Sequence, residues 1–483
     1  MELLLTLSLL LFAIIAISFT LNYILTPKIN NEKDEKPNNL PPGSSGWPLI
    51  GETLEYFSKL KDCIPEQFAT ERMKKYSTKV FRTNIIGQPT VILAGVEGNK
   101  FLFSNENKLV QAWWPATIDK IFPKSSKKTT REEFIKVRKM LHSFLKADGL
   151  QKYVEIMDLV MRESLERDWK GKKEVLAGEV VKKYTFGLAC RVVLGIDDSE
   201  KLEKLAKPTE DIAKGSVSIP INFPGTALYQ AIKSSKVMRI EIEEMIRKRK
   251  IEIAEKVEQK KNVLSTLLLA SDENSQFMNE EDISSHIAGL LHAGFDTLNS
   301  PLSFIMKYLV EYPDIYQKVL NEQMEVAKLK APKDLLNWDD AKRMKYSWSF
   351  VCEVLRLMPP GPGAFREAIT DFNYGGYFIP KGWKLHWMAH ITHKNPDHFP
   401  DPEKFDPSRF EGNGPAPYTY VPFGAGPRMC PGNEYARLVL LVFIHHMVLN
   451  FSWEKLISNE KIVSDPIPRL TKGFPIRLHP KYL

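Results

Sequence analysis

The spacing of apolar residues along the chain is mainly helical. Four long stretches repeat apolar side chains every three or four residues and are predicted as helices: Leu150 to Asp168, Ala227 to Lys260, Glu280 to Glu311 and Tyr435 to Phe451. Strand-like runs are few: Val80 to Ile86, Val91 to Ala94 and, interrupted by glycine and proline, Phe372 to Trp387. Because strands and helices do not alternate, a doubly wound fold is disfavoured, and the pattern predicts a mostly α fold with a small β-sheet.

The first 25 residues predict a membrane anchor. No charged side chain occurs from Leu3 to Leu25, and a helix of this length would span about 35 Å, enough to cross a bilayer. The segment lacks the leading positive charge and the small-residue cleavage site of a signal peptide, so an uncleaved signal anchor is favoured. Lysines after it favour a cytosolic body. A buried core helix is the alternative, but its scattered polar residues do not mark one face.

A polar tether and a proline-rich elbow follow the anchor. The tether contains few apolar residues, and the cluster of proline and glycine from Pro41 to Gly51 forms either a stiff hinge or an ordinary entry loop. No second linker, repeat or low-complexity run follows. The sequence therefore predicts an anchor over residues 1–25, a tether and hinge over 26–48, and one large domain over 49–483.

Composition narrows the classes of protein that the chain can belong to. The 483 residues are 43% hydrophobic and 26% charged, which supports a large core and excludes disorder, collagen and a small disulfide-rich module. A net charge of +8 over this length is too mild to indicate nucleic-acid binding. The four cysteines, Cys63, Cys190, Cys352 and Cys430, include no pair spaced like a zinc or redox site.

The segment from Phe423 to Gly432, FGAGPRMCPG, contains the most informative cysteine. Three glycines around Cys430 allow a tight loop whose backbone N–H groups can point at the sulfur, and the predicted helix that follows places its positive end there. Both effects favour a thiolate. With no histidine or aspartate nearby in the sequence to act as its base, metal ligation is a better interpretation than nucleophilic catalysis.

This loop resembles the haem-binding signature of cytochrome P-450 enzymes, in which Phe, Gly, Arg, Cys and Gly recur at the spacing of Phe423, Gly424, Arg428, Cys430 and Gly432. The resemblance implies the P-450 fold and a haem b cofactor. It implies that Cys430 is the axial ligand of the haem iron, that Arg428 pairs with a propionate, and that Phe423 packs beside the sulfur. A thiolate ligand promotes cleavage of the O–O bond.

A second match lies in the predicted helix 280–311. Residues Ala293, Gly294, Phe295, Asp296 and Thr297 resemble the family segment that crosses over the haem. The resemblance implies that Gly294 leaves room for dioxygen and that Asp296 and Thr297 relay protons to it. Taken alone, an Asp-Thr pair in a helix is more often solvated, with the threonine bonded to a backbone carbonyl. Pro301 is expected to bend this helix.

A third match joins two distant segments. Glu353 and Arg356 stand at i and i+3 of a helical run, where opposite charges meet and usually form no more than a surface ion pair. In the family, an arginine from a downstream loop joins such a pair, and Arg409 occupies the matching position. The resemblance implies a buried triad of Glu353, Arg356 and Arg409.

Arg138 and Arg366 resemble two further arginines that bind the haem propionates. The sequence departs from the family at Phe134, where a tryptophan or histidine is usual, so one hydrogen-bond donor to a propionate is expected to be missing.

The resemblance extends over essentially the whole chain and is strongest to the plant P-450 branch that oxidises triterpenes, including β-amyrin 28-oxidases and dammarenediol 12-hydroxylases. It implies hydroxylation or oxidation of an unactivated carbon on a dammarane, oleanane or ursane skeleton. The residues expected to line the substrate pocket are Trp113, Trp114, Ala293 and Phe474. Ordinary core packing is the alternative for each of them. A hydrocarbon of sterol size would be positioned by shape rather than by hydrogen bonds.

The same resemblance implies the partners and the location. Electrons would come from NADPH through cytochrome P-450 reductase, O2 would be the second substrate, and the catalytic domain would face the cytosol on a single anchor in the endoplasmic reticulum membrane. Seven Lys or Arg residues between Lys124 and Lys139 are predicted to dock the reductase.

Other functions remain as alternatives to triterpene oxidation. These are oxidation of another terpenoid or sterol, for example a taxane diterpene, rearrangement of a peroxide without external electrons, and haem binding without catalysis. The Asp296–Thr297 pair argues against peroxide rearrangement, because such relatives tend to lose it.

Overall fold

The computed structural model describes residues 39–122, 147–218, 220–255, 262–273, 279–331 and 333–481, together with residues 10, 13, 14, 17, 138, 141 and 145. Several predictions concern residues outside this part: most of the anchor over 1–25, the tether up to residue 38, Phe134, and nearly all of the basic run from Lys124 to Lys139. In the described residues, no helix has both the length and the apolar character needed to cross a membrane.

Two compact units make up the described chain, and each is treated separately. Unit 1 contains residues up to Trp113 and Gly363–Thr392, and unit 2 contains Trp114–Pro362 and His393–Leu483. The division of the sequence into an anchor, a tether and one catalytic domain stays a prediction.

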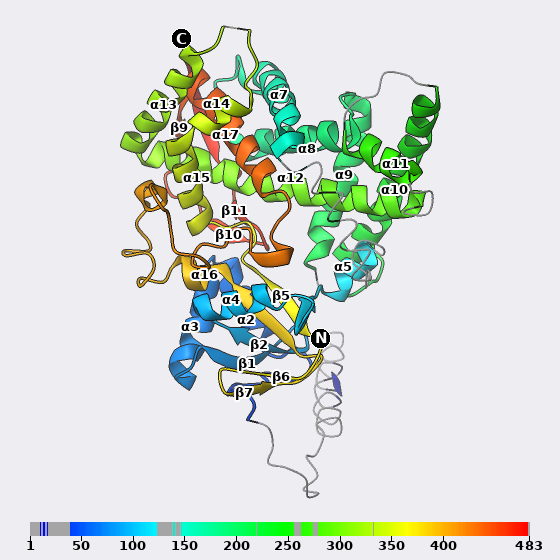
Figure 1. Cartoon of the computed structure of the whole chain (residues 1–483), viewed down its shortest axis with the longest axis vertical. Helices are drawn as coiled ribbons and strands as arrows, with labels where there is room; N and C mark the ends of the chain where they lie inside the picture. Colours follow the sequence, from blue (N-terminus) through cyan, green and yellow to red (C-terminus); the bar gives the residue numbers. More distant parts are fainter. Residues whose placement is uncertain are drawn as a thin grey trace, which may run out of the picture. The chain divides into compact units, whose positions relative to one another are not determined.

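Unit 1 is built around a twisted five-stranded sheet of strand order β1-β2-β8-β5-β3 (Figure 1). The strands are β1 (Val80–Ile85), β2 (Gln88–Leu93), β3 (Val110–Ala112), β5 (Gly363–Ala368) and β8 (Lys384–Met388), and β6 (Phe372–Tyr374) pairs with β7 (Tyr377–Ile379) as a separate hairpin. Only β2 and β8 are parallel neighbours within this sheet. The helices are α2 (Thr53–Lys61), α3 (Pro65–Tyr76), α4 (Gly95–Ser104) and α16 (Ala389–His393), whose last residue belongs to unit 2.

Unit 2 is mostly helical, and α12 crosses its centre (Figure 1). The helices are α5 (Ala116–Ile121), α7 (Ala147–Ser164), α8 (Ala177–Leu194), α9 (Ser199–Ser216), α10 (Ala227–Ala254), α11 (Val263–Glu273), α12 (Glu280–Glu311), α13 (Pro313–Lys328), α14 (Trp338–Arg343), α15 (Lys345–Leu357) and α17 (Asn433–Asn450). A π-helical turn, η1 (Leu165–Trp169), continues α7, and two 3₁₀ turns are η2 (Pro407–Phe410) and η3 (Gly426–Arg428). Two small sheets pair β4 (Glu174–Leu176), β12 (Pro475–Pro480) and β9 (Phe451–Lys455), and β10 (Ile462–Ser464) with β11 (Pro468–Leu470).

The central helix α12 follows from local sequence signals. Asn279 caps it by accepting a hydrogen bond from the backbone N–H of Asp282, and three acidic residues in its first turn complement the helix dipole. Its apolar stripe is buried against α8, α10 and α15. The helix continues through Pro301. The predicted mostly α fold with a small sheet is therefore confirmed, and the four predicted helices correspond to α7 with η1, α10, α12 and α17.

Candidate functional site

The loop before α17 holds Cys430 in a tight turn. Gly424 and Gly426 both adopt φ of +68°, a conformation that disfavours a side chain, and the Cys430 N–H donates to the Phe423 carbonyl at 2.8 Å. Gly432 precedes α17, and no side chain caps the N-terminus of that helix. The backbone N–H of Gly432 donates to the sulfur of Cys430. The tight loop is thus present, with one N–H group, that of Gly432, directed at the sulfur.

Two opposing influences act on the Cys430 thiol. Burial raises its pKa above the ordinary value, while the Gly432 N–H and the positive charge of Arg138 lower it. Arg138 also donates from Nη2 to the Met429 carbonyl at 2.5 Å. The Gly432 N–H and Arg138 stabilise the thiolate, but the effect of burial on the pKa is larger than theirs.

Two residues of the same turn, Phe423 and Arg428, lie beside this cysteine in the sequence. Phe423 is half-buried and packs against the main core of unit 2, while Arg428 ends the short turn η3 and is partly exposed.

The middle of α12 contains the residues that were predicted to lie over the haem. Ala293 and Thr297 lie one turn apart and are exposed, and the Thr297 hydroxyl donates to the Ala293 carbonyl at 2.6 Å. At Gly294 an added Cβ would meet no atom within 4 Å. Asp296, three residues after Ala293, lines a cleft between α12, α8, α9 and the β10–β11 hairpin. Burial raises the pKa of Asp296, and the charges of Lys182 and Arg469 oppose that increase.

Glu353, Arg356 and Arg409 come together as predicted. The Arg356 guanidinium donates Nε and Nη2 to the two Glu353 oxygens at 2.6 and 2.8 Å, and both side chains are 0% exposed. Arg409 Nε lies 3.5 Å from Glu353 Oε1. The Glu353 carboxylate also accepts the backbone N–H of Asp406 at 2.9 Å, which ties α15 to the segment before η2.

Arg366 lies in β5 of unit 1, where its main partner is a residue that the sequence did not suggest. Its Nε donates to Glu106 Oε2 at 2.7 Å, and the two side chains are 6% and 1% exposed. Its Nη1 donates to the Phe365 carbonyl. Among the described residues, no acceptor is positioned for Nη2 of Arg366, so that donor is available to a further carboxylate.

The predicted pocket residues are distributed over both units. In unit 1, Trp113 packs edge-on against Phe365. In unit 2, Trp114 is exposed, Ala293 lies on the exposed face of α12, and Phe474 is buried at the wall of the Asp296 cleft. These placements leave the assignment of the substrate pocket a prediction.

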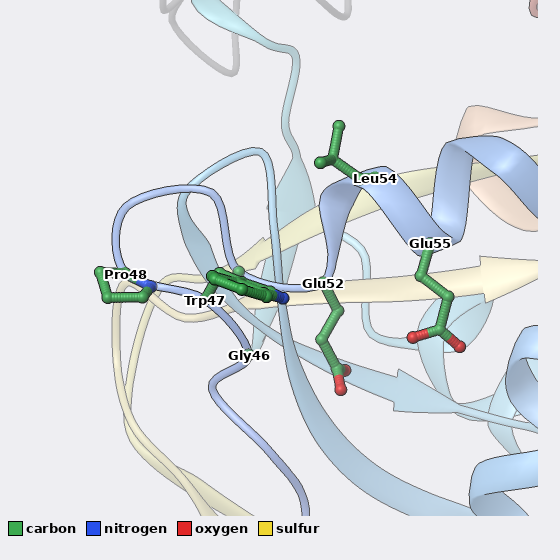
Figure 2. A pocket seen from close by; sticks show the side chains of 7 residues that line it. Gly46, Trp47, Pro48, Glu52, Leu54 and Glu55 are labelled. Atoms are coloured by element: carbon green, nitrogen blue, oxygen red, sulfur yellow. The ribbon is translucent and has the colours of Figure 1, made fainter. Parts of the chain in front are cut away.

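A second pocket, of about 570 Å³, lies at the proline-rich entrance of unit 1 (Figure 2). Its carboxylates are structural, because Glu52 and Glu55 both form ion pairs with Arg72. Across the described part of the chain, no three His, Cys, Asp or Glu side chains are arranged to hold a metal ion. The loop at Cys430 is therefore the better candidate for chemistry.

Known proteins match this chain over most of its length. The family model described as cytochrome P450 matches residues 41–474. The chain is 51% identical over 475 residues to a beta-amyrin 28-monooxygenase of Vitis vinifera, with 98% of each chain covered, and 52% identical to a beta-amyrin 16-beta-monooxygenase of Platycodon grandiflorus, with 96% and 98% covered. The retinoic acid-bound cyanobacterial CYP120A1 has a similar structure, with a TM-score of 0.82, 30% identity, and coverage of 92% of this chain and 100% of that chain.

Proposed function

The chain belongs to the cytochrome P450 family and is a monooxygenase of that family, and from this premise we propose that it oxidises an unactivated carbon of a triterpene skeleton of the β-amyrin kind. The observation that carries the proposal is the near-complete coverage of two curated relatives named for oxidation of β-amyrin. Since these relatives act on different carbons, positions 28 and 16, the skeleton is better supported than the site of oxidation. Dammarane and taxane skeletons remain the alternatives to test.

The residues around Cys430 fit a haem held by its sulfur. The sulfur already accepts a backbone hydrogen bond of the kind that supports a thiolate ligand, and the turn around it is fixed by Gly424 and Gly426. The open position at Gly294 leaves space beside α12, which packs against α17. Arg138, Arg366 and Arg428 would supply positive charge to the propionates. When bound, the haem supplies activation of dioxygen with electrons from a redox partner.

Asp296 and Thr297, in the middle of α12, would bind and transfer protons. The Thr297 hydroxyl donates its one O–H to the Ala293 carbonyl and lies on the exposed face, where its oxygen can accept a hydrogen bond from a bound ligand or water. Asp296 lies on the neighbouring face, toward the polar cleft. This pair also disfavours the alternative of peroxide rearrangement, which needs no proton supply of this kind.

We further propose that residues 1–25 anchor the chain in the endoplasmic reticulum membrane, with the catalytic part in the cytosol. In support, the N-terminal part of unit 1 exposes large apolar side chains: Trp47, Leu49 and Leu54 are 72%, 69% and 70% exposed. Trp47 and Leu54 lie at the pocket shown in Figure 2. Protease added to sealed microsomes should digest the catalytic part. In a separate sample, carbonate extraction should leave the intact chain in the membrane fraction. Protection of the catalytic part would contradict the orientation.

Electrons would come from NADPH through cytochrome P-450 reductase, docked on the basic run 124–139. Replacing Lys127 and Lys128 with glutamate should slow turnover supported by reductase and leave turnover supported by peroxide unchanged. Equal loss of both activities would contradict the docking site.

The test of the substrate is co-expression with a plant reductase in yeast strains that make β-amyrin, α-amyrin, lupeol or dammarenediol. Oxidised β-amyrin is the expected product, identified by mass spectrometry and NMR, and Cys430→Ser is the control that should abolish it. In the wild-type protein, the reduced carbon monoxide complex should show a red-shifted Soret band. A normal band with no triterpene product in any strain would overturn the substrate assignment and leave the haem assignment standing.

A further inference from the structure

Three buried polar atoms of α12 have no hydrogen-bond partner among the described residues: Ser285 Oγ, His292 Nδ1 and Asn299 Oδ1. In the described chain, no other side-chain nitrogen or oxygen of this helix is both buried and unpartnered. The three residues are spaced by seven, which is nearly two full turns, so they lie on one face at intervals of about 10.5 Å along the axis. Because buried polar groups in folded proteins are almost always paired, this face indicates a bound molecule along α12.

The His292 ring is packed against a fixed aromatic ring. Its centre lies 5.6 Å from that of Phe122, and the two ring planes are tilted by 32°. Phe122 is 5% exposed and directly follows α5. The last residue of α5, Ile121, accepts a hydrogen bond through its carbonyl from the Ser235 hydroxyl of α10 at 2.6 Å. The imidazole is thus held against an aromatic ring whose backbone is attached to α10.

The imidazole of His292 is neutral. Burial lowers its pKa to about 4, and no charged group contributes to that change. A neutral imidazole has one N–H donor and one acceptor nitrogen, so it can either donate to a hydroxyl group or accept from one. It would leave a carboxylate uncompensated, and a buried charge without a partner is costly. The ring therefore suits an uncharged ligand that carries oxygen.

The contact with Phe122 favours a largely apolar ligand over water. An ordered buried water makes about three hydrogen bonds, and the Phe122 ring supplies no partner for one. A triterpene alcohol presents one hydroxyl on a hydrocarbon skeleton, which matches one imidazole beside an aromatic ring. His292 is five residues before Thr297, about 7.5 Å along the helix axis. This is shorter than five fused rings, so a hydroxyl at one end of the skeleton can reach His292 while a distant carbon lies near Thr297.

We propose that His292 binds the hydroxyl group of the substrate, that the substrate is an uncharged triterpene alcohol, and that this hydrogen bond sets which carbon is oxidised. The inference rests on the proposed monooxygenase function and names the polar group that the enzyme recognises. His292 is a positioning residue, because it contacts the substrate away from the reacting carbon. Shape alone discriminates weakly between similar orientations of a hydrocarbon, whereas a buried polar group that must be paired discriminates strongly.

The first test measures binding without turnover. The ferric holoenzyme is titrated with β-amyrin and with olean-12-ene, which has the same skeleton without the hydroxyl, and the shift of the Soret band gives each Kd. The wild-type protein should bind β-amyrin about tenfold more tightly. His292→Leu should bind the two ligands equally, and His292→Asn, which keeps a donor and an acceptor, should retain part of the preference. Comparing two ligands with two proteins separates the contact itself from any general change in the helix.

The second test measures the products formed from β-amyrin with reductase and NADPH. The wild-type protein should oxidise one carbon predominantly, and His292→Leu should give a mixture of positions because the skeleton is no longer held at its hydroxyl. His292→Asn should restore part of the selectivity. A merely structural role for His292 would lower the yield of folded holoenzyme and leave the ratio of products unchanged.

The matched control is Ser303→Ala. Ser303 lies in the same helix, but its hydroxyl already donates to the Asn299 carbonyl at 3.0 Å, so the variant should leave the ligand preference and the products unchanged. Equal affinity of the wild-type protein for both ligands, or an undiminished preference in His292→Leu, would overturn the role of His292 alone. A wild-type protein with a normal carbon monoxide band that binds neither ligand would contradict the proposed function instead.

Discussion

Arg356 and Arg366 are ten residues apart in the chain, and each is buried against a glutamate, but the two pairs are built differently. Arg356 lies in α15 of unit 2 and meets Glu353 one turn away in the same helix. Arg366 lies in β5 of unit 1 and meets Glu106, which is 260 residues distant in sequence. The first pair is local and predictable from spacing, whereas the second exists only because β3 and β5 are neighbours in the sheet.

The two arginines also differ in how completely their donors are used. Arg356 donates to both Glu353 oxygens and to the His393 and Lys404 carbonyls, so four of the five N–H donors of its guanidinium are engaged inside unit 2. Arg366 has two acceptors in the described chain. Burial lowers the pKa of Arg366, and the Glu106 carboxylate opposes that change. The difference indicates a structural role for Arg356, and it is consistent with the proposal that Arg366 binds a propionate.

The largest expected effect is that of Arg356→Leu. It leaves the Glu353 carboxylate buried without its main partner, so the free energy of unfolding should fall by about 3–5 kcal/mol. Urea denaturation of the detergent-solubilised holoenzyme measures it, with Lys204→Met as a surface control that should change little. A double variant, Glu353→Leu with Arg356→Leu, should recover part of the loss because it removes both charges. A single variant as stable as the wild type would contradict a structural triad.

Glu106→Gln should cost less, about 2–3 kcal/mol, because glutamine keeps an acceptor for the Ala112 N–H and for Arg366. The comparison predicts that this loss is local. Amide hydrogen exchange should increase in β3 and β5 of unit 1 and stay unchanged in α15. Faster exchange in α15 would show that the two pairs are not independent.

Buried histidines provide a similar comparison between the units. His386 in unit 1 contacts the Ala364 carbonyl through Nδ1 and the Tyr56 hydroxyl through Nε2, and His393 in unit 2 contacts the Arg356 carbonyl and the Val421 N–H. Each carbonyl requires a protonated Nδ1. The Val421 N–H requires an unprotonated Nε2 on His393, so that ring is neutral, and burial favours the neutral ring at His386. Burial lowers their pKa values to about 4 and about 3.

Acid should therefore destabilise both units. Because the folded pKa lies below the unfolded value of about 6.5, the unfolded chain binds the proton first, and the stability present above pH 6.5 is lost as the pH falls toward 4. Replacing His386 with asparagine should remove about 1.4 kcal/mol of the difference in unfolding free energy between pH 7.5 and pH 5.5. Denaturation at both pH values measures it. Exposed His398 is the control, and an equal effect from His398→Asn would contradict the assignment.

The sequence predicts those features of the structure that are determined by residues close together in the chain. The helices, the Cys430 turn and the Glu353–Arg356 spacing are fixed by residues within a few turns of one another, and the structure contains all of them. Glu106 and Lys182 carry no such signal, because their partners lie on elements that only the fold brings together. The structure places Phe474 at the wall of the Asp296 cleft, and its predicted position over the substrate stays a prediction.

The smallest expected loss of unfolding free energy is that of Arg409→Lys, because Arg409 is the least buried residue of the triad. Arg409 is 12% exposed, its Nε is 3.5 Å from Glu353 Oε1, and its Nη2 donates to the Asp401 carbonyl at 3.1 Å. Lysine keeps the charge near Glu353 but loses the fixed geometry that reaches Asp401, so Arg409→Lys should cost about 1 kcal/mol. The same urea denaturation measures it beside Arg356→Leu. If Arg409→Lys lowered the unfolding free energy as much as Arg356→Leu, Glu353 would depend equally on both arginines. The i, i+3 spacing of Glu353 and Arg356 would then not be enough to predict the ion pair that matters most.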